Sequence, residues 1–127
     1  MDRVTPIAVD GPVASGKTAV GRLLSRKLGY RFLDTGIMYR ALTWLALERG
    51  VDPEDAHGLV EMAKGHELGV VFGSDEDARI LVDDQDITPN LWRREVDRAV
   101  SLVSRVTGVR ELLVDHQRCI AAEGAVV

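Results

Sequence analysis

The sequence predicts an α/β fold in which a parallel sheet with crossover helices is interrupted by a small mixed insert. Two observations predict the sheet: short apolar runs end in turns, and each run is followed by a segment whose apolar residues have helical spacing. A third observation predicts the insert, because two short apolar runs are joined by the polar stretch GSDEDA, as in a β-hairpin. The chain has 127 residues, which suits one domain with a single core.

The first half of the chain contains two strand–helix pairs. Asp10 and Gly11 close the first apolar run, as expected where a buried strand enters a turn. Glycine follows each helical segment, where it can end the helix. We therefore expect a strand at 7–9, a helix at 17–28, a strand at 30–33 and a helix from about 37 to 49.

The second half begins with a helix start at Asp52-Pro53-Glu54-Asp55, with Asp52 as the N-cap and proline in the first turn. This helix is expected to reach about His66. The elements expected after it are hairpin strands at 68–72 and 79–82, helices at about 89–106 and 109–122, and a buried strand that begins at 124–127.

Charge and composition narrow the classes of function. The net charge of −4 argues against sequence-independent binding of nucleic acid, which needs a basic face. No apolar run approaches 18 residues and no secretory leader is evident, so we expect a cytoplasmic protein with no membrane contact. Cys119 is the single cysteine, which excludes a disulfide within the chain.

The most specific motif is a phosphate-binding loop. Residues 11–18 fit the pattern G-x-x-x-x-G-K-[ST], with an expected strand before the loop and an expected helix after it. The loop's backbone N–H groups can surround an anion, Lys17 can reach the β- and γ-phosphates, and the Thr18 hydroxyl can bind Mg²⁺. The sequence therefore predicts a site for a nucleoside triphosphate and Mg²⁺, made by Gly11, Pro12, Val13, Ala14, Ser15, Gly16, Lys17 and Thr18.

Two other uses of such a loop are disfavoured. A GTPase would carry the guanine-reading motif N-K-x-D, which this sequence lacks. A motor-type ATPase would carry an acidic strand end, which the run at 79–84 imitates. That run follows the GSDEDA turn rather than a crossover helix, so a hairpin strand is the better interpretation.

The stretch at 33–40, LDTGIMYR, indicates a second phosphate. It follows the second expected strand, and ligands of parallel sheets bind at the carboxyl ends of strands. If the sheet is parallel, this strand is expected to lie beside the strand of the phosphate loop. Thr35 offers a donor and an acceptor, and Arg40 lies one turn into the following helix. An arginine near a triphosphate suits phosphoryl transfer between two nucleotides, although on spacing alone a solvated helix arginine is the better interpretation.

The stretch at 10–42 closely resembles the N-terminus of bacterial-type cytidylate (CMP/dCMP) kinases, in the P-loop nucleoside monophosphate kinase family. The resemblance continues through GVD at 50–52, DITPNLWRREV at 86–96, and Ser101, Val109-Arg110 and Gln117-Arg118. It implies an ATP-dependent kinase that converts CMP and dCMP to CDP and dCDP.

The resemblance also implies roles for individual residues. Thr35 and Ser101 would read the cytosine base, Arg40 would hold the acceptor phosphate, and Arg110 would reach the acceptor's base edge or phosphate. Lys17, Arg40 and Arg110 would then supply the catalytic positive charge. Residues at about 38–106 would form the monophosphate-binding insert, while the roles of Asp10 and Asp34 stay open.

The family pattern continues past the position of Val127, so we expect this chain to be the N-terminal part of a longer enzyme that is a monomer when intact. Two alternatives remain: a kinase for another monophosphate such as UMP, and a nucleotide-binding module without turnover. Trp44 and Trp92 are expected to pack in the core or at a hinge rather than to stack on a base.

Overall fold

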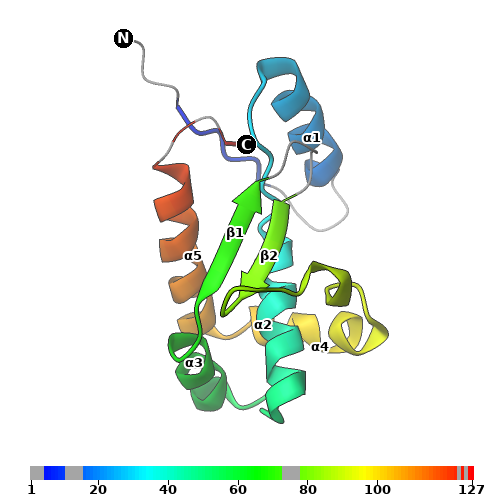
Figure 1. The fold of residues 1–127 in the computed structure, drawn as a ribbon, viewed down its shortest axis with the longest axis vertical. Helices are drawn as coiled ribbons and strands as arrows, with labels where there is room; N and C mark the ends of the chain where they lie inside the picture. The colour runs from blue at the N-terminus through cyan, green and yellow to red at the C-terminus, as the bar shows by residue number, and fades with distance from the viewer. Residues whose placement is uncertain (1–4, 11–15, 73–77, 123, 125) are drawn as a thin grey trace.

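The computed structural model describes residues 5–10, 16–72, 78–122, 124 and 126–127 (Figure 1). Five α-helices, a short 3₁₀ helix and a three-stranded sheet make up the described chain. In chain order they are α1 (Lys17–Leu28), α2 (Gly36–Arg49), α3 (Ala56–Lys64), β1 (Leu68–Phe72), β2 (Ala78–Val82), β3 (Gln85–Asp86), η1 (Thr88–Asn90), α4 (Arg94–Ser104) and α5 (Thr107–Ala121).

Helix α2 is the centre of the core. Its apolar residues are spaced so that several sides of the helix are buried, with Met38, Ala41 and Ala46 fully so. The helix packs against α4, α3 and strand β2, and Figure 1 shows the sheet crossing in front of it. The core cluster extends to Leu59 of α3 and Val109 of α5. Packing on α2 therefore joins α3, α4 and strand β2 in one core.

The hairpin is confirmed. Strands β1 and β2 pair antiparallel, with Leu68 opposite Val82 and Phe72 opposite Ala78, and β3 extends the sheet beside β2. The acidic run at 79–84 therefore belongs to a hairpin strand and its turn. The turn residues Asp83 and Asp84 have positive φ angles of 49° and 67°, as in a type I′ turn.

Asp83 also links this turn to the end of α3. One carboxylate oxygen accepts the Glu67 backbone N–H at 2.9 Å, and the other lies 2.6 Å from Nδ1 of His66. The Glu67 N–H, followed by the His66 side chain, lowers the pKa of Asp83. The α3–β1 connection and the β2–β3 turn are thereby held side by side.

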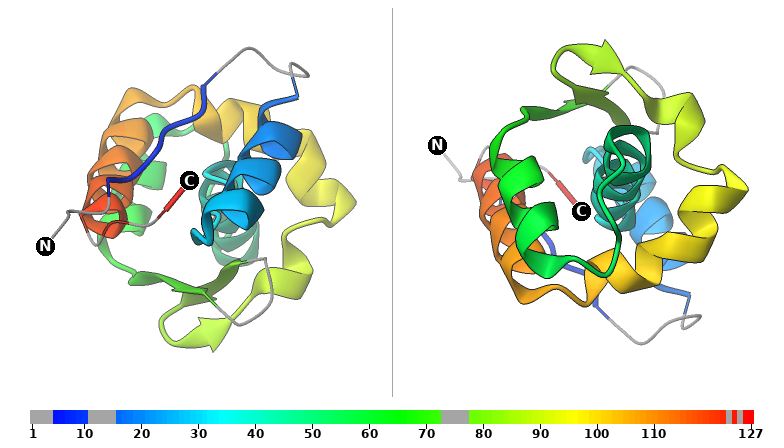
Figure 2. Two further views of the ribbon diagram at one scale, coloured as in Figure 1. Left: turned by 90° about the horizontal axis from the view of Figure 1, so that it is seen from above. Right: turned by 90° about the horizontal axis from the view of Figure 1, so that it is seen from below.

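The two ends of the described chain are joined by backbone hydrogen bonds. Ile7 N–H donates to the Val126 carbonyl at 2.8 Å, Val127 N–H to the Arg31 carbonyl at 2.8 Å, and Leu33 N–H to the Val127 carbonyl at 2.9 Å. The expected strands at 7–9, 30–33 and 124–127 are reduced to one parallel bridge, between Arg31 and Val126. The prediction that 7–9 and 30–33 are neighbours was wrong, because 126–127 lies between them (Figure 2, left).

Two expected helix starts were also wrong. Asp52 accepts the Glu54 N–H in a preceding turn, whereas Asp55 caps α3 through Gly58 N–H at 3.0 Å. The helix expected from residue 89 is divided: Pro89 lies in η1, and Arg93 has an extended backbone, so α4 begins at Arg94. The break predicted near Thr107-Gly108 is present but lies at 105–106, since α4 ends at Ser104 and α5 already includes Thr107 and Gly108.

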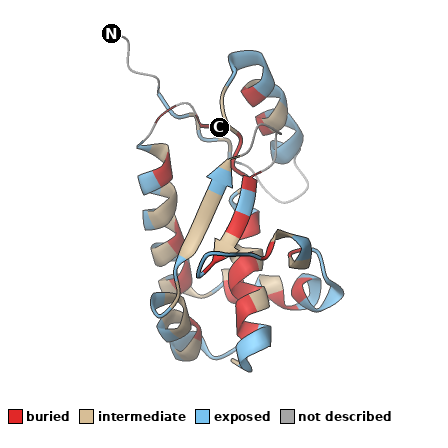
Figure 3. Ribbon diagram, viewed as in Figure 1, coloured by how far each residue is buried: buried red, intermediate tan, exposed pale blue. Residues whose placement is uncertain are grey.

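Helix α1 packs least on the rest of the chain. Only Gly21 and Ser25 are buried, while Val20, Leu23 and Leu28 are about half exposed (Figure 3). The helix contacts the body of the protein at Phe32, which lies under Gly21 and beside the guanidinium of Arg22. Within the described part of the chain, no helix is both long and apolar enough to cross a bilayer.

Candidate functional site

A cavity of about 330 Å³ lies where α1, the turn before α2 and the two ends of the chain meet. Lys17 and Thr18 line it at the start of α1, and Asp34 and Thr35 line it at the start of α2. Three predicted site residues, Lys17, Thr18 and Thr35, therefore lie around one cavity. Residues 11–15 of the predicted phosphate loop lie outside the described residues.

The start of α1 suits an anion. Gly16 precedes the helix with φ of 88°, a left-handed conformation that a residue with a side chain adopts at a cost. The first backbone N–H groups of a helix have no partner within it, so they can donate to a bound phosphate. Lys17 adds a full positive charge at the same place. This part of the site fits a polyphosphate.

The same cavity contains oxygen donors that fit Mg²⁺. Thr18, Asp10 and Asp34 are among its lining residues, and hydroxyl and carboxylate oxygens are ligands that Mg²⁺ prefers. Asp34 also accepts the Gly36 N–H at 3.0 Å, which fixes the turn into α2. The Thr35 hydroxyl makes no capping bond to α2.

Arg40 is a residue of α2 that does not line this cavity, and its side chain reaches across to α4. Its Nη1 donates to the Leu91 carbonyl at 3.1 Å and to Oδ1 of Asp97 at 2.5 Å. Its Cζ lies 4.4 Å from the centre of the Trp92 ring. Of the two places expected for Trp92, the core or a hinge, the core was wrong: the residue is 60% exposed and lies against the Arg40 guanidinium.

Ser101 and Arg110 are both exposed. Ser101 lies one turn after Asp97, so the two share a face of α4. Arg110 lies on α5 beside a separate shallow depression, with Glu111 and Arg118 among its neighbours. Among the described residues, no hydrogen bond or ion pair joins Arg110 to Arg40 or to the residues that line the cavity.

Arg110 is nevertheless aligned with the cavity along α5. Seven residues make nearly two helical turns, so Arg110 and Gln117 lie on one side of α5, about 10 Å apart along its axis. Gln117 lines the cavity, and its Nε2 lies 3.7 Å from Sδ of Met38 on α2.

The sequence interpretation missed the partners of Arg40. Asp97 precedes Ser101 by four residues, and this spacing is a signal that they share a helix face. Nothing in the local sequence pairs Trp92 with an arginine on another helix.

These features define an α/β protein with a cationic helix start and a cavity suited to phosphate. The chain belongs to the cytidylate kinase family, because the model of that family matches residues 7–127. It is 42% identical to a cytidylate kinase of Pelotomaculum thermopropionicum, with 100% of this chain and 56% of that protein aligned. It is 41% identical to a cytidylate kinase of Streptococcus sanguinis, over 95% of this chain and 54% of that protein.

The chain is also 44% identical to a bifunctional pantoate ligase/cytidylate kinase of a Synechococcus strain, over 95% of this chain and 23% of that larger protein. The chain spans about half the length of the single-function relatives it matches. The region in common includes every predicted site residue.

Proposed function

We propose that this chain is the N-terminal part of an ATP-dependent kinase that phosphorylates CMP and dCMP. The observation that carries the proposal is the cavity shared by Lys17, Thr18 and Thr35, since it combines a triphosphate site with a residue expected to read the acceptor base. The names of the relatives support the choice of acceptor.

The donor side of the site is proposed to hold ATP. Lys17 neutralises the β- and γ-phosphates, and the backbone N–H groups at the start of α1 donate to the phosphate oxygens. The Thr18 hydroxyl, with the loop at 11–16, completes this side. A Mg²⁺ ion bound with ATP would supply further positive charge at the phosphates.

The acceptor side is proposed to run from Thr35 along α2 to Arg40 and across to Ser101 on α4. Thr35 and Ser101 would bind the cytosine edge, and Arg40 and Arg110 would bind the acceptor. An acceptor phosphate oxygen attacks the γ-phosphorus as the bond to the β-phosphate oxygen breaks. That oxygen is already ionised near neutral pH, so the step needs alignment and positive charge rather than a general base.

Finer features of the family are part of the same proposal. The complete sheet would be parallel with crossover helices, and about 38–106 would form the monophosphate-binding insert. The protein would act in the cytoplasm on small molecules, as a monomer, without nucleic acid or a membrane.

A coupled phosphotransfer assay with Mg-ATP tests the proposal, using CMP, dCMP, UMP and AMP as acceptors. The expected result is turnover selective for CMP and dCMP, either by this chain or by a longer form that contains it. Lys17→Met should abolish that turnover, and its effect on ATP binding by the 127-residue chain is measured separately by calorimetry. Equal rates with UMP would contradict the cytosine assignment, and ATP binding without turnover in both forms would favour a nucleotide-binding module.

A further inference from the structure

We infer that Asp97 and Trp92 position Arg40 so that one edge of its guanidinium is available to the acceptor phosphate. The inference rests on the proposed function, in which Arg40 binds that phosphate. Neither Asp97 nor Trp92 is one of the predicted site residues, and both contact Arg40.

The first step is the anchoring of Nη1. This nitrogen donates to the Leu91 carbonyl and to the Asp97 carboxylate, which uses both of its N–H groups. Leu91 is 1% exposed, so its carbonyl is held by the core. Asp97 lies near the start of α4, where the helix dipole stabilises a negative charge.

The second step concerns the flat face of the Arg40 guanidinium and the edge formed by Nε and Nη2. The Trp92 ring lies against the guanidinium at 4.4 Å, which limits rotation of the planar group. Within the described chain, Nε and Nη2 have no hydrogen-bond partner, so three N–H groups remain. Two parallel N–H donors are what a bidentate contact to phosphate needs.

A competing interpretation makes Asp97 an inhibitor, because a carboxylate beside Arg40 repels a phosphate. The two interpretations predict opposite changes in CMP affinity when Asp97 is removed. If Asp97 positions Arg40, its removal weakens CMP binding; if it competes with phosphate, its removal strengthens CMP binding. Positioning is favoured because Asp97 binds Nη1 only and leaves the other edge open.

The test is calorimetric titration of the chain with CMP and with cytidine, which lacks the phosphate. We expect Asp97→Ala and Trp92→Leu each to weaken CMP binding by about three- to tenfold and to leave cytidine binding unchanged. Asp97→Asn retains an acceptor oxygen and should restore most of the affinity lost in Asp97→Ala. Thermal unfolding of each variant verifies that the fold is intact.

A double-mutant cycle with Arg40→Ala separates positioning from a structural effect. In the Arg40→Ala background, Asp97→Ala and Trp92→Leu should change CMP binding by less than about twofold, because the group they position is gone. An unchanged or higher CMP affinity of the single variants overturns the positioning role. Failure of Arg40→Ala itself to weaken CMP binding overturns the proposed role of Arg40 and, with it, this inference.

Discussion

A Cβ atom at Gly108 of α5 would lie 2.6 Å from Cγ2 of Val60 on α3, so the two helices are in contact where only a hydrogen atom fits. This contact fixes the start of α5. The same helix carries Arg110 and Gln117, so the contact also bears on the acceptor side of the proposed site.

Gly108→Ala should therefore destabilise the protein by about 1–2 kcal/mol, because overpacking against the stiff Val60 side chain outweighs the better helix propensity of alanine. Urea denaturation measures the free energy of unfolding. Val60→Ala removes the clashing methyl group, so the double variant should recover part of the loss. A Gly108→Ala protein as stable as the parent would show that α3 moves aside at little cost.

Asp84→Gly should stabilise the β2–β3 turn by about 1 kcal/mol, because glycine adopts a positive φ without the steric cost that a side chain carries. The same substitution leaves the neighbouring Asp83 in its contacts with Glu67 and His66. Asp84→Asn is the matched control, since asparagine tolerates the left-handed region about as well as aspartate. If Asp84→Asn raised the thermal stability as much as Asp84→Gly, the positive φ of residue 84 would not explain the gain.

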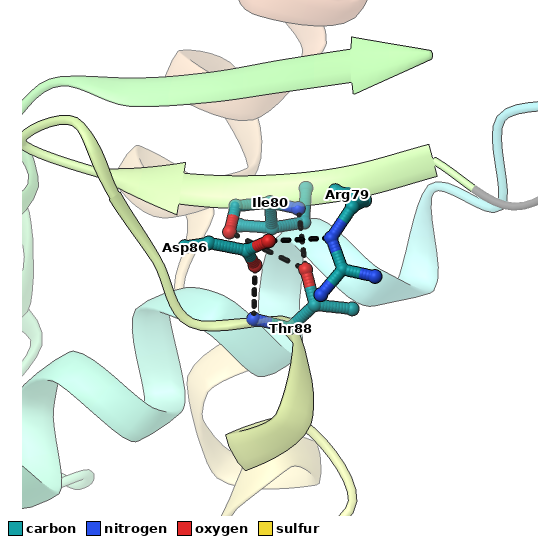
Figure 4. A network of polar contacts seen from close by, with 4 residues as sticks. All are labelled: Arg79, Ile80, Asp86 and Thr88. Atoms are coloured by element: carbon teal, nitrogen blue, oxygen red, sulfur yellow. Dashed lines mark hydrogen bonds and ion pairs between the residues drawn. The ribbon is translucent and has the colours of Figure 1, made fainter. Parts of the chain in front are cut away.

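Asp86 connects β3 to β2 and to η1. Its carboxylate accepts hydrogen bonds from Nε of Arg79 and from the Thr88 backbone N–H, while the Thr88 hydroxyl accepts the Ile80 N–H at 2.9 Å (Figure 4). The Thr88 side chain, then Arg79 and the Thr88 N–H, lower the pKa of Asp86 from 3.8 to about 2.

A lowered pKa in the folded state means that Asp86 stabilises the fold above its ordinary pKa of 3.8, and that this contribution disappears as the pH falls through about 2. Asp86→Asn should cost about 1 kcal/mol or less at pH 6, since solvent screens this partly exposed carboxylate. The cost should shrink between pH 4 and pH 2, as measured by urea denaturation at each pH. Asp84→Asn is the matched control for removing a charge from the same turn, because the Asp84 carboxylate has no hydrogen bond in the described chain.

Ser101→Ala tests base reading on the proposed acceptor side. A lost hydrogen bond to the cytosine edge should raise KM for CMP by about tenfold and reduce the preference for CMP over UMP. Ser104→Ala is a matched control on the same helix, because the Ser104 hydroxyl donates to the Ser101 carbonyl within α4. A rise in KM that is equal for CMP and UMP would argue that Ser101 contacts the sugar or phosphate instead.

Local patterns in the sequence were sufficient for several elements. The apolar runs on either side of GSDEDA predicted the β1–β2 hairpin, and the spacing of Met38, Leu42 and Leu45 predicted α2. The phosphate-loop pattern predicted that Lys17 begins a helix, and the structure has α1 beginning there. These features depend on turn chemistry and on periodicity over a few residues, which can be read directly from the chain.

Only the tertiary structure decided which distant residues meet. Arg40 and Asp97 are 57 residues apart, and their contact exists because α2 packs on α4. Residues 126–127 lie between 5–10 and 30–33 because backbone donors and acceptors from three distant segments pair there. No local propensity encodes such pairings, since each depends on how the helices and strands share one core.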